Sequence, residues 1–532
     1  MILGTNRREH KLMFDLIIKN GKLVDGTGSA WFYGDVAIQG QRIVEVGRLS
    51  SQSAKRVIDA MGLVVAPGFI DSHSHSDEAL LLNRKAESKI LQGVTTEVIG
   101  QCGASAAPFI ADNYDAELST QLPAWQTMSQ YLALLNNPGV AVNVIPLFGH
   151  ANVRQRVMGM ADRQATADEL AAMCQLAKEL MQQGAFGFSS GLIYPPSSYA
   201  DTAELVAIAK AVAACGGIYT THIRNENDRL LDAVREAITI GEAAGIPVHI
   251  SHHKACGEAN WGSVRDSLAL VDIKRAAGVD ITLDQYPYVA TSTGLKVIIP
   301  QWAHADGVEA MRQRVLDPEL GVRIREEMLA SKHRWDWMLV AACAKEENKQ
   351  FEGKNIEEIA AMTEQSPLEA ALALLLSEDF NVGMVRFAMC EEDVEYVMRH
   401  PLVMIGSDAS ALATTGPLSK GKPHPRAYGT FARVLGHYVR ERGILTLEDA
   451  VRKMTGLAAA RFRLWDRGLL RPGCFADITI FDEDVVCDQA TFVNPHCYAK
   501  GIDYVLVNGH VAVDQGRQTE RLAGKALRNI CW

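Results

Sequence analysis

The chain contains no hydrophobic run long enough to cross a membrane, although 48% of its 532 residues are hydrophobic. A membrane-spanning helix needs roughly 18 or more consecutive apolar residues, and the densest apolar segment, residues 370–376, is much shorter. The first twelve residues are mainly polar and lack the apolar region of a signal peptide. We therefore expect a cytoplasmic protein without a membrane partner.

An excess of basic residues is also absent, because 53 Lys and Arg residues are outnumbered by 63 Asp and Glu residues and the net charge is -10. Without a broad positive field, nucleic acid is not expected as the main partner. The ten cysteines are scattered without paired spacing, which is typical of reduced thiols and not of a disulfide framework. Reduced thiols remain available as metal ligands.

Eight short apolar runs alternate with helical patterns along most of the chain. The chain is long enough for two or three domains, or for one large barrel with additions. Runs that are apolar on both faces and alternate with helices indicate a parallel sheet, and eight of them fit a TIM-like (β/α)8 barrel of the α/β class. A different doubly wound fold is the alternative. The runs are residues 63–70, 94–99, 140–148, 185–193, 217–221, 246–250, 279–286 and 402–405.

The two ends of the chain have a different pattern. Residues 15–25 and 504–514 are both alternating segments around an Asn-Gly pair, the strongest short signal for a β-hairpin. With residues 35–44 and 476–481 they predict a small composite β-sandwich domain built from both termini. We place its two parts at residues 1–64 and 467–532, with the barrel at residues 65–466 between them.

The barrel itself is expected to carry an insertion. Over a hundred residues separate the seventh run from the eighth, which is too long for a loop of a compact barrel. Residues 366–376 have the apolar spacing of a helix. The sequence therefore predicts an inserted helical subdomain at about residues 290–400, which could cover a site as a lid.

Side chains that can bind a metal stand at the ends of several of these runs. The active sites of parallel barrels lie at the C-terminal ends of the strands, so we expect these side chains to meet. Two of them, His73 and His75, follow the first run at a spacing of i, i+2. Side chains with that spacing point to the same side of a strand. The candidates are His73, His75, Cys102, His222, either His252 or His253, and Asp408.

The chemistry of these groups favours zinc. A cysteine thiolate with two imidazoles, from Cys102, His222 and the sixth-strand histidine, is a good set of three zinc ligands and leaves a fourth position for water. His73, His75 and Asp408, with Cys102 shared, could hold a second ion. The fourth run, residues 185–193, contains no lysine.

Seven motifs together resemble the amidohydrolase superfamily of metal-dependent hydrolases, and more narrowly the N-acyl-D-amino-acid deacylases (D-aminoacylases), over nearly the whole chain. The motifs are PGFIDSHSH (67–75), GQCG (100–103), THIRNE (221–226), ISHHK (250–254), DQYPY (284–288), GSD (406–408) and HPRAYGT (424–430). Many members of the superfamily bridge two metals with a carboxylated lysine on the fourth strand. In the deacylases a cysteine takes its place, and the resemblance implies that this residue would be Cys102 here.

The resemblance implies a function and roles for named residues. It implies hydrolysis of N-acyl-D-amino acids to a D-amino acid and a carboxylate, with one tightly bound Zn²⁺ and a possible second, weaker site. It selects His252 over His253 as the ligand. A metal-bound hydroxide would attack the amide, and Asp408 would shuttle the proton. The residues implied to bind substrate are Tyr194 near the scissile carbonyl and Lys254, Tyr286, Ser292 and Arg426 at the α-carboxylate.

A preference for apolar substrate side chains is expected from residues 289–295, which are small, largely apolar and without arginine. Lys296, which follows them, could reverse that preference. Two other functions remain. A cyclic-amide hydrolase of the dihydropyrimidinase or dihydroorotase kind would share the His-x-His pair and the final Asp, but the usual lysine is missing. A catalytically inactive barrel that acts as an interaction protein would be expected to have lost ligands, and every ligand position is filled.

Overall fold

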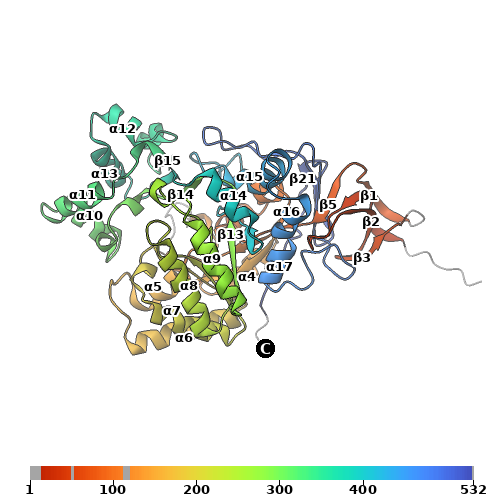
Figure 1. Ribbon diagram of the computed structural model, residues 1–532, viewed down its shortest axis with the longest axis horizontal. Coiled ribbons are helices and arrows are strands. Elements are labelled where there is room, and N and C mark those ends of the chain that lie inside the picture. Colours follow the sequence, from red (N-terminus) through yellow and green to blue (C-terminus); the bar gives the residue numbers. More distant parts are fainter. Residues whose placement is uncertain (1–12, 50–52, 112–119, 530–532) are drawn as a thin grey trace, which may run out of the picture.

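The computed structural model describes residues 13–49, 53–111 and 120–529. The segment on which the expectation about a signal peptide depends, residues 1–12, lies outside them. Among the described residues, none of the helices has the length and apolar character needed to cross a bilayer. The elements fall into three groups: a parallel barrel, a β-domain at one end of the long axis and an insertion at the other (Figure 1).

The barrel consists of two sets of parallel strands that join on both sides. Leu147, between β8 and β9, donates its N–H to Ile99 O at 3.0 Å, and β9 pairs with β10. On the other side Ser74 and Ala409 form a parallel bridge. The strands, in chain order, are β6 (Phe69–Asp71), β7 (Val94–Ile99), β8 (Asn143–Pro146), β9 (Phe148–Gly149), β10 (Gly187–Gly191), β11 (Ile218–His222), β12 (Val248–Ile250), β13 (Ile281–Gln285) and β17 (Val403–Ile405). The predicted α/β barrel is confirmed.

Amphipathic helices cover the barrel strands. α8 shows why they form: Leu230, Val234, Ile238 and Gly241 lie on one buried face, and Gly245 ends the helix in the left-handed conformation at φ 64°. The helices outside the insertion are α1 (Ala79–Leu82), α2 (Glu87–Ile90), α4 (Met128–Asn136), α5 (His150–Met158), α6 (Ala167–Gln182), α7 (Thr202–Ala213), α8 (Leu230–Ala244), α9 (Val264–Ala276), α14 (Glu391–Arg399), α15 (Arg426–Arg433), α16 (Leu447–Met454) and α17 (Gly456–Arg461).

The β-domain is a nine-stranded sheet that combines strands from both ends of the chain, as predicted. Its order is β21-β20-β19-β18-β5-β1-β2-β3, with β4 paired to β1. The first predicted barrel run, residues 63–70, is divided between this sheet and the barrel, because β5 pairs with β18 and β6 pairs with β7. The strands are β1 (Phe14–Leu23), β2 (Phe32–Gln39), β3 (Arg42–Gly47), β4 (Ala54–Asp59), β5 (Val64–Pro67), β18 (Ile478–Phe481), β19 (Ile502–Val507), β20 (His510–Asp514) and β21 (Arg517–Gln518). The exact domain boundaries stay a prediction.

Of the two predicted Asn-Gly hairpins, one is confirmed and one is wrong. Asn508 and Gly509 turn the chain between β19 and β20 with φ values of 49° and 77°. Asn20 instead lies inside β1, where the register against β2 shifts between Ile18 and Gly21. The N–H of Asn20 is bonded to the buried Asp35 carboxylate at 2.8 Å. That bond stabilises the left-handed residue as a β-bulge, so β1 continues and pairs with β5.

The insertion between β13 and β17 has a hydrophobic core of its own. It contains the predicted helices, and Ser366 caps α13 by accepting from Glu369 N. It also contains a three-stranded antiparallel sheet that the sequence did not suggest. Its elements are β14 (Ala290–Gly294), η4 (Leu295–Ile298), α10 (Val308–Leu316), α11 (Leu320–Ala330), β15 (Met338–Ala342), α12 (Ile356–Thr363), α13 (Pro367–Ser377) and β16 (Gly383–Phe387). A lid function stays a prediction.

Candidate metal centre

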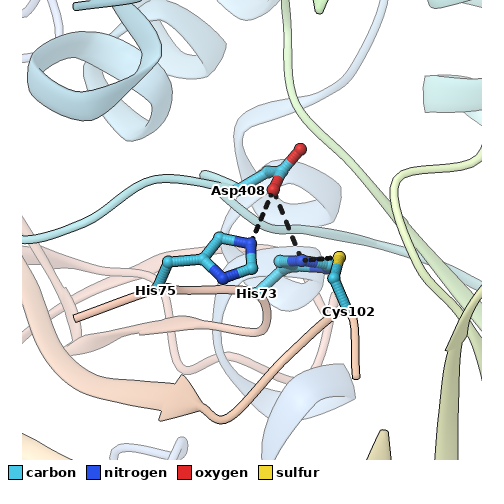
Figure 2. Close-up of side chains that lie close together, drawn as sticks. All are labelled: His73, His75, Cys102 and Asp408. Atoms are coloured by element: carbon cyan, nitrogen blue, oxygen red, sulfur yellow. Dashed lines mark hydrogen bonds and ion pairs between the residues drawn. The ribbon is translucent and has the colours of Figure 1, made fainter. Parts of the chain in front are cut away.

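The six ligand candidates converge at the C-terminal ends of the barrel strands. They are His73 and His75 after β6, Cys102 after β7, His222 at the end of β11, His252 after β12 and Asp408 after β17. Their donor atoms form two groups, His73–His75–Cys102–Asp408 and Cys102–His222–His252, and within each group all donor atoms lie within 4.8 Å of one another. Figure 2 shows the first group, in which the side chains point toward one another.

The Cys102 sulfur belongs to both groups. Its Sγ lies 3.3 Å from His73 Nε2, 3.4 Å from His252 Nε2 and 3.7 Å from His222 Nδ1. Cys102, His252 and Asp408 have φ values of 53°, 35° and 51°. A positive φ is unfavourable for residues other than glycine and is concentrated at functional sites. The backbone thus holds three donors in an unfavourable conformation that brings them together.

The electrostatics of the site favour a thiolate at Cys102 and raise the pKa of His73, His75 and His252, whereas burial lowers the pKa of His222. Burial raises the pKa of Cys102, but the charges of His73 and His252 lower it more, and the net shift is to well below the usual value. Burial lowers the pKa of His75, but hydrogen bonds to Asp408 and Cys102 raise it to about 9. Zinc binds a thiolate and neutral imidazoles, and a bound ion would displace the protons that these imidazoles hold.

Asp284 on β13 holds the imidazole of His73 from behind. Its Oδ2 lies 3.3 Å from His73 Nδ1 and 2.7 Å from His249 Nε2, and its Oδ1 accepts the backbone N–H of His252 at 2.7 Å. Burial raises the pKa of Asp284, but the charge of the neighbouring His73 lowers it by more than burial raises it. The net shift of the pKa is therefore downward. A carboxylate behind a histidine fixes the tautomer and the orientation of the ring.

Lys254, a predicted substrate anchor, lies in an ion pair with Glu226. Lys254 Nζ donates to Glu226 Oε1 at 2.5 Å and to His252 O at 2.8 Å. Burial raises the pKa of Glu226, but Lys254 and the two site histidines lower it more. His253, the alternative on the same strand, faces away and bonds Ser267 Oγ at 2.9 Å. The geometry therefore favours His252 as the ligand.

The remaining predicted substrate residues lie around Asp408. Arg426 Nη1 is 2.8 Å from Asp408 Oδ2, and its guanidinium lies 4.6 Å from the Tyr286 ring centroid. Arg426 Nη2 also lies 3.4 Å from the backbone oxygen of Ser292. Tyr194 Oη is 3.1 Å from Thr293 Oγ1. β14 of the insertion thus supplies one wall of the site.

A buried lysine supports the loop that carries Asp408. Lys89 is fully buried, and its Nζ donates to Asp71 Oδ2, Ser407 Oγ and Ala409 O, each at 2.7 Å. Ser407 and Ala409 flank Asp408. The ammonium therefore holds the Ser407 hydroxyl on one side of Asp408 and the Ala409 backbone carbonyl on the other.

Sequence reasoning missed Asp284, Glu226 and Lys89 as site residues. Asp284 and Glu226 belong to the DQYPY and THIRNE motifs, so a carboxylate next to a ligand-bearing strand end was the available signal. Nothing in the sequence around Lys89 distinguishes it from a solvated helical lysine.

The comparisons with known proteins agree with this geometry. Residues 56–513 match the model of the amidohydrolase family. The chain is 39% identical over 518 residues to the D-aminoacylase of Alcaligenes xylosoxydans xylosoxydans, with 97% of each chain covered. A crystal structure of N-acyl-D-glutamate deacylase from Bordetella bronchiseptica, complexed with zinc and a phosphonate inhibitor, matches with a TM-score of 0.82 and 35% identity over 97% of this chain and 100% of that one.

A D-aminoacylase structure concerned with the functional role of a binuclear metal centre, with one-metal activation and second-metal attenuation, matches with a TM-score of 0.83 and 38% identity. The match covers 97% of this chain and all of that one. The similarity therefore spans the barrel, the β-domain and the insertion. The chain belongs to the amidohydrolase family, in its group of N-acyl-D-amino-acid deacylases.

Proposed function

We propose that the protein is a zinc-dependent hydrolase that converts N-acyl-D-amino acids to a D-amino acid and a carboxylate. The observation that carries the proposal is the pair of donor groups that share the Cys102 sulfur beside the Asp408 carboxylate. Relatives that span the whole chain are a D-aminoacylase and a zinc-bound N-acyl-D-glutamate deacylase. The missing lysine on β10 argues against a cyclic-amide hydrolase, and the complete donor set argues against an inactive barrel.

The donor chemistry fits zinc. Cys102, His222 and His252 would hold the tightly bound ion, and His73, His75 and Asp408 with Cys102 would form the weaker site. When bound, zinc supplies Lewis acidity and a water of lowered pKa. The binuclear centre of the related D-aminoacylase supports a second, weaker site.

Asp408 is the proposed proton shuttle. Burial raises the pKa of its carboxyl, but Arg426 and the site histidines lower it to well below the usual value. The carboxylate is therefore ionised at neutral pH and can take a proton from the attacking water and return it to the leaving nitrogen. Tyr194, on the side of the site that faces β14, is the candidate to bind the scissile carbonyl.

The substrate carboxylate is expected near Tyr286. The centroid of its ring lies 5.7 Å from Lys254 Nζ and 4.6 Å from the Arg426 guanidinium. The buried Tyr286 hydroxyl has no hydrogen-bond partner among the described residues. An unpartnered donor on a ring that lies near two cations is suited to an anion. The nearby Ser292 is the fourth candidate for this contact.

A cytoplasmic location without nucleic-acid partners is part of the proposal. The nine described cysteines are all free, which supports a reducing compartment. The function is tested by a hydrolysis screen of N-acetyl-D- and N-acetyl-L-amino acids, with zinc analysis of the purified protein. Zinc in about equimolar amount and hydrolysis of the D-forms are expected. Hydrolysis of the L-forms alone, or of cyclic amides alone, would contradict the proposal.

A further inference from the structure

Glu226 stands behind two of the ligand histidines, on the side away from Cys102. His222 and His252 each direct one ring nitrogen at the Cys102 sulfur. On their outer side Glu226 Oε1 lies 3.0 Å from His252 Nδ1, and Oε2 lies 3.7 Å from His222 Nε2. The Glu226 side chain is only 10% exposed. One buried carboxylate therefore reaches the rear of both rings.

Lys254 competes with Glu226 for the same ring nitrogen. Its Nζ lies 2.7 Å from His252 Nδ1, in addition to its bonds to Glu226 Oε1 and His252 O. An ammonium has three protons, so these three partners occupy all of them. A carboxylate only accepts and an ammonium only donates, so His252 Nδ1 can bond to one of them at a time.

We propose that Glu226 is a positioning residue that couples the zinc ligands to the anchor of the substrate carboxylate. A histidine that ligates a metal through one nitrogen keeps its proton on the other. With Nε2 directed at the ligand position beside Cys102, His252 donates from Nδ1 to Glu226. Lys254 then has no acceptor at Nδ1, and one of its protons is free for the substrate carboxylate. Glu226 and His252 O still hold the other two.

The first half of the proposal concerns zinc and can be tested without substrate. Loss of a carboxylate that orients a ligand histidine typically costs about 10- to 100-fold in metal affinity. We expect Glu226→Gln to weaken zinc binding by that factor, measured by chelator competition, and Glu226→Asp to restore part of it. The matched control is Glu204→Gln, because Glu204 is another buried carboxylate that contacts a histidine, His150 at 2.9 Å, outside both donor groups.

The second half rests on the proposed function. At saturating zinc, Glu226→Gln is expected to raise KM for N-acetyl-D-leucine more than it lowers kcat. The same variant should lose about tenfold of the preference for D-leucine over D-leucinamide as competitive inhibitors, because Glu226 also holds the Lys254 ammonium in the place from which its free proton reaches the carboxylate. Glu204→Gln should change neither value.

Each outcome has a defined meaning. Unchanged zinc affinity in a folded Glu226→Gln protein overturns the positioning role, and Glu226→Asp decides the matter if the Gln variant does not fold. Weakened zinc binding with an unchanged carboxylate preference overturns the coupling to Lys254. Wild-type protein that binds zinc but hydrolyses no N-acyl-D-amino acid would refute the proposed function, and the zinc measurement would still decide the role of Glu226.

Discussion

Asp408 Oδ2 lies 2.8 Å from Nη1 of Arg426. The other carboxylate oxygen, Oδ1, faces the imidazoles and lies 3.0 Å from His75 Nε2. Asp408 therefore stands between the candidate metal ligands and the candidate substrate anchors. This placement suits a group that moves a proton between a water and a leaving nitrogen.

Replacement of this carboxylate should affect turnover far more than metal content. We expect Asp408→Asn to keep the fold and most of the zinc, and to lower kcat by at least ~100-fold, the usual scale for loss of a general acid or base. The control is Asp272→Asn, an exposed residue that pairs with His400. An Asp408→Asn protein with near-normal kcat would remove Asp408 from the mechanism.

Cys102 is the donor that both groups share, so its loss should be the most damaging to metal binding. We expect Cys102→Ala to lose the zinc and the activity together, as measured by metal analysis and N-acetyl-D-leucine hydrolysis. Cys174→Ala, a change on the outer helix α6, should retain both. Near-stoichiometric zinc in the Cys102→Ala protein would show that the sulfur is not a required ligand.

Zinc affinity should rise with pH between about 7 and 9 in the metal-free protein. The pKa of His75 is raised to about 9, so below that pH the free protein carries a proton on His75 that a metal must displace. By the same linkage, this proton stabilises the folded metal-free protein fully below the unfolded pKa near 6.5, and the stabilisation is lost as the pH rises through about 9.

The measurement is an apparent zinc Kd for the weaker site at several pH values, in wild type and in His75→Gln. The wild-type slope should exceed that of the variant, because glutamine does not titrate. Identical slopes would mean that His75 does not gain or lose the proton in this range.

The sequence predicted the barrel because eight apolar runs and their helices carry a local signal that does not depend on distant contacts. The prediction of a hairpin at Asn20 was wrong because the conformation there depends on a distant contact. Asn-Gly favours a turn locally, but the Asp35 carboxylate, 15 residues away, accepts the Asn20 N–H and stabilises a bulge, so the strand continues past it. Such a partner cannot be read from the turn residues.

The same distinction applies to the site. The ligand candidates were visible because each one ends a strand of a barrel, a position at which geometry implies convergence. Whether His252 or His253 faces the site depends on the backbone conformation of His252, whose φ is 35°. The apolar periodicity of the sequence does not encode that conformation. Lys89 was missed because its partners Asp71, Ser407 and Ala409 become neighbours only when the barrel closes.

The burial of Lys89 predicts a large loss of stability when its charge is removed. Lys89→Met leaves Asp71 buried without its cation, and breaking a buried pair in this way typically costs about 3–5 kcal/mol. Lys85→Met is the matched control, because Lys85 lies near it in the chain and its pair with Glu520 is exposed, worth about 0–1 kcal/mol. Urea unfolding of the zinc-free proteins measures both, and equal free energies of unfolding would contradict the prediction.

The last prediction concerns the enantiomer and side chain of the substrate. With its α-carboxylate at the proposed contact near Tyr286 and its carbonyl near Tyr194, a chiral substrate would be fixed at two points, so the direction of the side chain alone would separate the two enantiomers. The D-form is the one that the related D-aminoacylase is named for. Residues 289–295, which include the wall on β14, contain no cation that could pair with an acidic side chain of the substrate.

Burial of a leucine-sized side chain against such a wall is worth up to ~1.5–3 kcal/mol, which corresponds to about 10- to 150-fold in kcat/KM. We therefore expect N-acetyl-D-leucine to exceed both N-acetyl-L-leucine and N-acetyl-D-glutamate in kcat/KM. Lys296 is exposed and has no ion-pair partner in the described part of the chain, so Lys296→Met should leave the D-leucine value unchanged. A higher value for the L-form would contradict the proposed function. A higher value for glutamate that falls in Lys296→Met would place this lysine in the pocket and refute only the apolar preference.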